Sequence, residues 1–126
     1  MRALYETCNL LEMANISKKT TKLPVNIWIQ CEMSTQHNKP RIKFQNNYAN
    51  RFETDDLVPL SIEDTPTILA NNVKLNISSK DLQKVIDWVV KNKILLLKLW
   101  KLTISFDEFL VKMKREYRNN VPIVVH

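Results

Sequence analysis

Residues 78–100 carry the longest regular pattern of apolar and polar positions in the chain. Leu82, Val85 and Val89 recur at the spacing of one helix face, and the apolar residues of 94–100 broaden that face. Ser78 stands just before the pattern, with Asp81 three positions later. A serine hydroxyl at this position accepts a hydrogen bond from the free amides at a helix start. The pattern predicts a helix over residues 78–100 that forms part of the core.

Two other segments have helical periodicity. Phe106, Phe109 and Met113 lie on one side of the segment that follows Ser105, which has the spacing of a helix cap. We therefore expect a helix over residues 105–118. Apolar positions within residues 2–14 predict a short N-terminal helix, and the polar, basic residues 16–22 are interpreted as a connector.

Residues 24–77 contain the strand-like patterns. Ile27 and Ile29 alternate with polar or larger residues, and Ile42 and Phe44 do the same within residues 41–46. Residues 57–62 and 73–77 give two further predicted strands. Together these patterns predict a single α+β domain over residues 1–126. Its antiparallel sheet of three to four strands lies within residues 24–77, and helices pack on one face in two layers.

Composition and charge narrow the classes of function. The 126 residues include no glycine and have a formal net charge of +6. Residues 1–50 carry seven basic and three acidic residues (+4), residues 51–81 three and six (−3), and residues 82–126 nine and four (+5). Such a layout is typical of a surface that faces RNA or an acidic protein, and it also suits an ordinary solvated surface.

Few enzymatic chemistries fit this sequence. Without glycine, neither a phosphate-binding P-loop nor a dinucleotide fingerprint is present. His37 is the main candidate for a general base, with Arg41 or Lys43 holding a phosphate in a metal-independent ribonuclease. No metal-loop spacing is found among the acidic residues Asp55, Asp56, Glu63 and Asp64. We expect a non-enzymatic protein with no catalytic residue, no metal and no cofactor, and the ribonuclease remains an alternative.

Two cysteines bear on the compartment. Cys8 and Cys31 are too few to indicate a disulfide framework or a zinc site, and Cys31 falls among the inward positions of its predicted strand. The apolar run 94–100 is too short for a membrane span, and residues 1–15 do not have the pattern of a signal peptide. We therefore predict reduced thiols, a cytoplasmic location and no membrane partner.

A basic and aromatic patch is the first candidate binding site. Trp28, Arg41 and Lys43 lie opposite the apolar stripes of their strands, and Tyr48 and Arg51 lie in the following loop. If the strands pair, an exposed Trp beside two cations can stack a base and hold a phosphate. Two alternatives stay open: Trp28 is covered by the N-terminal helix, or the patch is an interface with a protein.

The predicted final helix is the second candidate. Its basic residues are Lys112, Lys114, Arg115 and Arg118. Cations gathered in this way can bind the phosphate backbone of RNA. A solvated helix face explains the same residues.

Three stretches carry a resemblance to known proteins: RIKFQNNYANRF (41–52), LVPLSIEDTP (57–66) and residues 77–110, which begin ISSKDLQKVIDW. They resemble small proteins of bacteriophages and mobile elements from AT-rich bacteria, some of which are anti-CRISPR inhibitors. The resemblance implies a non-enzymatic inhibitor that binds a bacterial defence ribonucleoprotein, through its effector protein or its guide RNA. The alternative is an RNA-binding antitoxin or regulator that uses the same patch.

Overall fold

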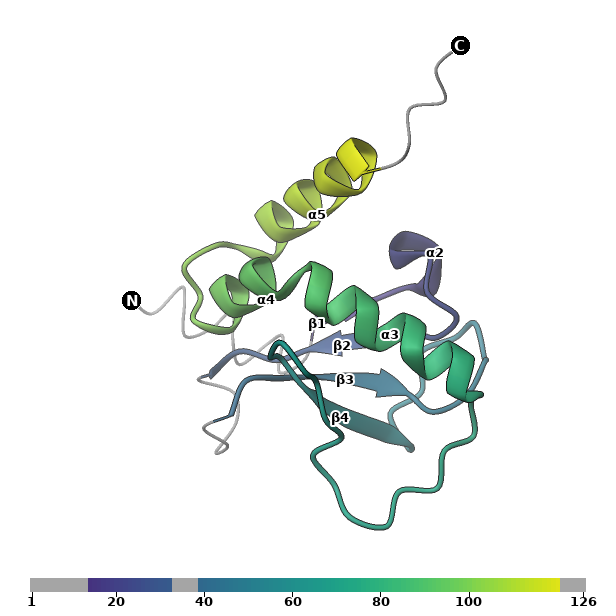
Figure 1. The fold of residues 1–126 in the computed structure, drawn as a ribbon. Helices are drawn as coiled ribbons and strands as arrows, with labels where there is room; N and C mark the ends of the chain where they lie inside the picture. Colours follow the sequence, from purple (N-terminus) through teal and green to yellow (C-terminus); the bar gives the residue numbers. More distant parts are fainter. Residues whose placement is uncertain (1–13, 33–38, 121–126) are drawn as a thin grey trace.

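The computed structural model describes residues 14–32 and 39–120, with the backbone alone described from residue 115 onward. Within these ranges the chain forms one antiparallel sheet with helices above it (Figure 1). The buried apolar side chains of sheet and helices form one continuous cluster. The predicted α+β class and its two-layer arrangement are confirmed.

The sheet contains four strands in the order of the sequence. They are β1 (Ala14–Ile16), β2 (Ile27–Ile29), β3 (Arg41–Gln45) and β4 (Leu57–Ser61). Each strand pairs antiparallel with the next, which gives the order β1-β2-β3-β4. Because neighbours in sequence are also neighbours in space, the alternation of each strand directly determines which side chains share a face.

The apolar face of the sheet follows from its register. Ile27 lies opposite Phe44, and Ile29 lies opposite Ile42, which in turn lies opposite Leu60 on β4. All five side chains are buried. This face is therefore the floor of the core.

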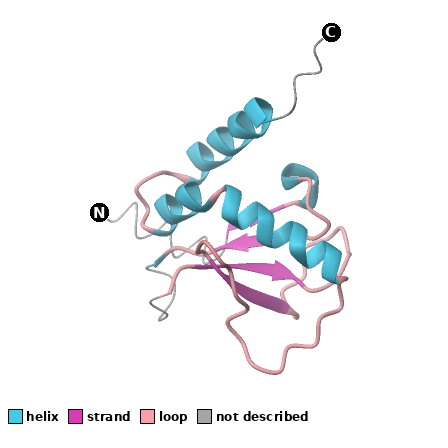
Figure 2. Ribbon diagram, in the orientation of Figure 1, coloured by secondary structure: helices cyan, strands magenta, loops and turns pink. Residues whose placement is uncertain are grey.

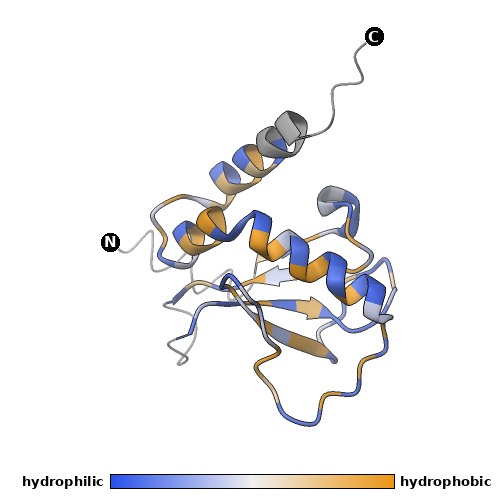
Figure 3. Cartoon of the chain, viewed as in Figure 1, coloured by the Kyte–Doolittle hydropathy of each residue, from blue (hydrophilic) through white to orange (hydrophobic). Residues whose placement is uncertain are grey.

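The second layer is helical. The helices are α2 (Lys18–Thr21), α3 (Ser79–Lys91), α4 (Lys93–Trp100) and α5 (Phe106–Asn120). Figure 2 shows α3 and α4 lying across the sheet, and α5 follows α4 after a short loop. Apolar and polar positions alternate along α3 (Figure 3), as expected for a helix with one face on a core. None of the helices in the described ranges combines the length and hydrophobicity that a bilayer crossing requires.

The predicted helix over residues 78–100 begins as expected but is not continuous. The backbone N–H of Asp81 donates to Ser78 Oγ at 3.1 Å, which confirms the N-cap. The helix is interrupted at Asn92, where φ is −102° and ψ is 15°. Asn92 is buried, and its Nδ2 donates to the carbonyl of Trp88 at 2.9 Å. An Asn side chain that bonds the backbone locally competes with helix continuation, which explains the separation of α3 from α4.

The N-terminal predictions hold only in part. The predicted helix over residues 2–14 lies outside the described residues except for Ala14, which begins β1 instead. The predicted connector 16–22 is wrong, because Ile16 completes β1 and α2 follows it. Ser17 caps α2, and Lys22 ends it in the left-handed region at φ 66°. A chain without glycine must place other residues at such positions.

The predicted strand over residues 73–77 is wrong. This segment is a loop that bonds to a side chain rather than to a neighbouring strand. Asn46 Nδ2 donates to Lys74 O at 2.9 Å, and Asn46 Oδ1 accepts from the Asn76 N–H at 2.8 Å. The alternation of apolar residues is still used, because Ile77 is buried in the core cluster. The described sheet therefore ends at β4, with one isolated bridge between Leu60 and Ile68.

The prediction of reduced thiols is wrong for Cys31. This residue follows β2, is buried, and is disulfide-bonded. Burial of Cys31 within the fold was predicted and is confirmed.

Candidate functional site

The predicted stacking platform on the sheet is not present. Trp28 does lie directly opposite Lys43, as the predicted strand pairing requires. However, Trp28 is only 2% exposed, and the ring of Phe52 meets it edge-on with centroids 5.3 Å apart. A Trp side chain on the polar face of a sheet exposes a large apolar area, and covering it is favourable. Trp28 is therefore a packing residue in this structure.

The two cations of the predicted patch differ in their surroundings. Arg41 is 8% exposed, and its Nε donates to the carbonyl of Lys39 at 3.2 Å. Burial lowers the pKa of the Arg41 guanidinium from its usual value. Lys43 is half-buried beside Trp28. Arg41 is therefore not an open cation, and the Trp ring beside Lys43 is not open to a base.

Tyr48 fastens the loop after β3 to the start of α3. Its hydroxyl donates to Asp81 Oδ2 at 2.7 Å and accepts from the backbone N–H of Ser78 at 2.9 Å. The hydrogen bond from Tyr48 is the main reason that the pKa of Asp81 is lowered. In the same loop, Arg51 Nε donates to Glu53 Oε2 at 2.9 Å. Both predicted contact residues in this loop thus form bonds within the chain.

The buried side-chain amides of Asn26 and Gln45, which were not predicted from the sequence, bind the backbone of the loop after β3. Asn26 Nδ2 lies within 3.1–3.5 Å of the carbonyl oxygens of Ala49, Asn50 and Arg51. Gln45 Nε2 reaches the Arg51 carbonyl at 3.1 Å, and Gln45 Oε1 accepts from the backbone of the same loop. Both amide side chains are fully buried. A buried side chain that bonds several carbonyls replaces the strand partner that the loop lacks.

The predicted basic helix contributes one side chain to a cavity. Lys112 pairs with Glu108 across one turn of α5 at 3.5 Å. Lys114 lines the cavity described below. The side chains of Arg115 and Arg118 lie outside the described part of the chain, so their predicted contacts stay predictions.

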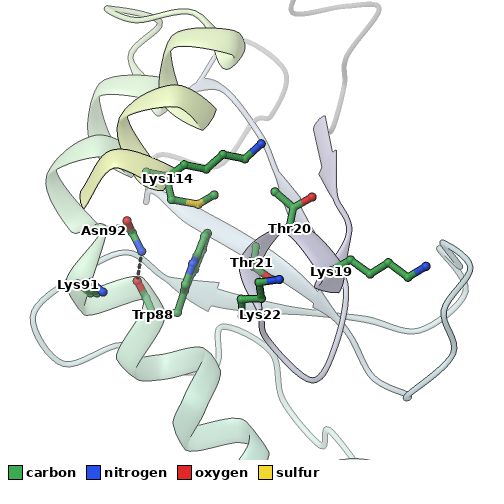
Figure 4. A pocket seen from close by; sticks show the side chains of 9 residues that line it. Lys19, Thr20, Thr21, Lys22, Trp88, Lys91, Asn92 and Lys114 are labelled. Carbon is green, nitrogen blue, oxygen red and sulfur yellow. Dashed lines mark hydrogen bonds between the residues drawn. The ribbon is translucent and has the colours of Figure 1, made fainter. Parts of the chain in front are cut away.

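A basic pocket lies where α2, the end of α3 and α5 meet (Figure 4). Its volume is about 440 Å³. Four lysines line it: Lys19, Lys22, Lys91 and Lys114. The remaining lining residues are Thr20, Thr21, Trp88, Asn92 and Met113. We refer to this cavity as the lysine pocket.

Local structure accounts for each wall of the lysine pocket. On one side, the single turn of α2 ends at Lys22, whose N–H bonds back to Lys18 O, and residues 19–22 of this turn line the cavity. On the opposite side, Asn92 ends α3 and holds the Trp88 carbonyl. Figure 4 shows the Trp88 ring between α2 and the Lys114 side chain, which extends across the upper part of the pocket. Trp88 and Met113 are 8% and 5% exposed and form the apolar wall.

The electrostatic character of the lysine pocket is uniform. No acidic residue is among the described residues that line it. Lys19, Lys22 and Lys114 form no ion pair with any carboxylate in the described ranges, whereas five other lysines do. Cations such as these three, which have no described counter-charge, raise the local concentration of anions. The pocket is thus suited to an anionic ligand that also presents some apolar surface.

Sequence reasoning found only Lys114 of this site. Lys19 and Lys22 fall in the segment interpreted as a connector, and Trp88 lies off the main apolar stripe of its helix. The cavity joins residues 19–22, 88–92 and 113–114, and no local pattern links these three segments. The one available signal was the net positive charge of residues 1–50 (+4) and 82–126 (+5).

The other predicted chemistries find no assembled site among the described residues. His37, the proposed base of a ribonuclease, lies outside them. Glu63 bonds Ser61 and Lys39, and the Ser61 bond is the main cause of the lowered pKa of Glu63. Across residues 14–32 and 39–120, no three His, Cys, Asp or Glu side chains are grouped closely enough to hold a metal ion.

Comparison of the chain with protein-family models, curated proteins and solved structures finds no match. The predicted resemblance to bacteriophage proteins therefore stays a prediction. Among the described residues, the lysine pocket is the feature that bears most directly on function.

Proposed function

We propose that this chain is a non-enzymatic RNA-binding protein and that the lysine pocket is its contact with the RNA. The observation that carries the proposal is the position of Lys19, Lys22 and Lys114, from α2 and α5, beside a cavity whose described lining contains no carboxylate. Lysines that neutralise phosphates release condensed counterions, which drives binding. The proposed contact is therefore the cavity between α2, α3 and α5 rather than the predicted patch on the sheet.

The inhibitor predicted from the resemblance is a special case of this proposal. A protein that covers the phosphates of a guide RNA would compete with a defence effector for that RNA. The lysine pocket supports the RNA contact, and it carries no information on the effector. Inhibition of a bacterial defence ribonucleoprotein is thus proposed as the setting in which the RNA contact acts.

A charge-reversal experiment tests the RNA contact. We would measure the fluorescence polarisation of a labelled 12-nucleotide RNA with the wild type and with the double variant Lys22→Glu/Lys114→Glu, from 50 to 300 mM salt. Three lysine–phosphate contacts predict a slope of log K against log salt of about −2 for a single strand, and loss of two contacts makes it shallower by about 1.4. We expect the double variant to bind roughly 10–100-fold more weakly at low salt.

A matched control separates the pocket from overall charge. Lys74 and Lys80 are exposed, lie away from the lysine pocket and form no described ion pair, so Lys74→Glu/Lys80→Glu makes the same charge change elsewhere. The control is expected to retain most of the affinity. Equal loss in both double variants would show that the pocket is not the contact. Absence of RNA binding at 50 mM salt would overturn the proposed function itself.

The same samples test the ribonuclease alternative. RNA recovered after incubation is expected to be intact on a denaturing gel. Cleavage that disappears in His37→Ala would replace the proposal with an enzyme. An affinity capture from bacterial lysate, with and without ribonuclease, would then test the defence setting: retention of an effector after RNA digestion would instead show a direct protein contact.

A further inference from the structure

We infer that the lysine pocket takes one unpaired nucleotide of a single-stranded RNA, with the base inside the cavity and the phosphates on the lysines. This inference rests on the proposed function and names the form of the RNA. It follows from the shape and the composition of the cavity rather than from its charge alone.

The volume argues for a single unit of a chain. A cavity of about 440 Å³ lies in the range of pockets that hold small ligands, roughly 300–1,000 Å³. A duplex keeps its bases stacked and paired and presents only backbone and groove edges to a protein. Binding of phosphates alone does not require a cavity, because lysines on a flat or ridged surface contact phosphates equally well.

The lining argues for a base. The exposed edge of the apolar wall formed by Trp88 and Met113 can contact a base, and such aromatic contacts tolerate any base. Half-buried Thr20 adds a hydroxyl at the side of the cavity, where base edges need hydrogen-bond partners. The Lys114 side chain extends over the upper part of the cavity (Figure 4), where it can reach a phosphate of the nucleotide.

Trp88 supplies a built-in reporter. The chain has three tryptophans, and the other two, Trp28 and Trp100, are 2% and 1% exposed and do not line the cavity. A base in the lysine pocket is therefore expected to change the fluorescence of Trp88 alone. Trp88→Phe should remove the signal and Trp28→Phe should keep it.

The experiment compares strands of one sequence. We would titrate the wild type with a 12-nucleotide RNA, either single-stranded or annealed to its complement, and follow both polarisation and tryptophan fluorescence. The single strand is expected to bind at least tenfold more tightly and to quench Trp88, and the duplex is expected to bind without quenching. Nucleoside monophosphate forms a third arm and is expected to quench only at far higher concentration, because it lacks neighbouring phosphates.

A blocking variant avoids disturbing the core. Thr20 is half-buried on α2, so Thr20→Phe narrows the cavity without removing a lysine, and exposed Thr54 gives the matched control Thr54→Phe. We expect Thr20→Phe to weaken single-strand binding about tenfold and to leave duplex binding unchanged. Equal affinity for single-stranded and duplex RNA, with no effect of Thr20→Phe, would overturn this inference but leave the proposed RNA-binding function in place. Monophosphate binding as tight as the 12-mer would overturn it in favour of a free nucleotide, and loss of all RNA binding would remove the proposed function as well.

Discussion

Asn26→Asp is expected to destabilise the protein by about 3–5 kcal/mol at pH 7. The substitution keeps the shape of the side chain and its Oδ1, which accepts from the Lys18 N–H at 2.9 Å. It replaces the Nδ2 donor with an oxygen that faces the carbonyls of Ala49, Asn50 and Arg51. Two hydrogen bonds at a time are lost, at about 1 kcal/mol each, and a buried acceptor without a donor adds about 1–3 kcal/mol.

The measurement is urea unfolding followed by circular dichroism, with thermal unfolding as a second probe. For a chain of this length the expected loss corresponds to a fall in Tm of roughly 10–20 °C. Asn71→Asp is the matched control, because Asn71 is exposed and makes the same change of charge. We expect the control to stay within about 0.5 kcal/mol of the wild type.

The pH dependence of Asn26→Asp separates lost hydrogen bonds from a buried charge. Burial among carbonyls raises the pKa of the introduced carboxyl in the folded state above its unfolded value of about 3.9. The ionisation penalty is therefore absent below pH ~4 and grows as pH rises toward the folded pKa. The deficit against wild type should narrow at pH 4. A variant as stable as Asn71→Asp at pH 7 would refute the conclusion that the buried amides hold the loop.

Three further predictions concern other parts of the fold. Tyr48→Phe removes the acceptor of the Ser78 N–H, at a cost of about 1 kcal/mol, and should raise the pKa of Asp81 in an NMR titration. Because that pKa is lowered in the folded state, ionised Asp81 stabilises the fold above pH ~4, and this contribution is lost below pH ~4. The difference in unfolding free energy between wild type and Tyr48→Phe should therefore narrow on acidification. A difference that does not change with pH would contradict the hydrogen bond between Tyr48 and Asp81. Lys22→Gly should stabilise by about 0.5–1 kcal/mol in urea unfolding, since relief of the left-handed conformation exceeds the entropy cost of glycine, and a loss would contradict the conformation at φ 66°. When the protein is unfolded without reductant, Cys31 should resist alkylation by iodoacetamide, as read by peptide mapping, and it should react after reduction. Labelling of Cys31 before reduction would contradict its disulfide.

The elements predicted correctly are those whose causes are local. Ser78 and Ser105 mark helix starts because each hydroxyl bonds the backbone only three residues away. The strands around Ile27 and Ile42 follow from alternation, because one face of the sheet is buried along its whole length. These signals act within a few residues, so the sequence displays them directly.

The errors share a different cause, which is bonding between distant segments. The alternation of residues 73–77 resembles a strand, but Asn46, about 30 positions earlier, bonds its backbone. Asn92 interrupts an apolar run that reads as continuous helix, because its side chain turns back to Trp88. Trp28 was placed on the correct face and beside Lys43, and only the position of Phe52 shows that a contact covers it.

The lysine pocket could not be predicted because it too joins distant segments of the chain. This arrangement also determines when the pocket can form during synthesis of the protein. Residues 19–22 leave a ribosome early and Lys114 leaves late, so the pocket cannot form until nearly all of the described chain has been made. The sheet, whose strands pair in order of appearance, can form before then. A ligand held at 100 times its Kd would add about 2.7 kcal/mol to the stability of the completed fold. A bound ligand would thus stabilise the contact between the early and late parts of the chain. It would not stabilise an unfinished chain, in which the pocket is incomplete.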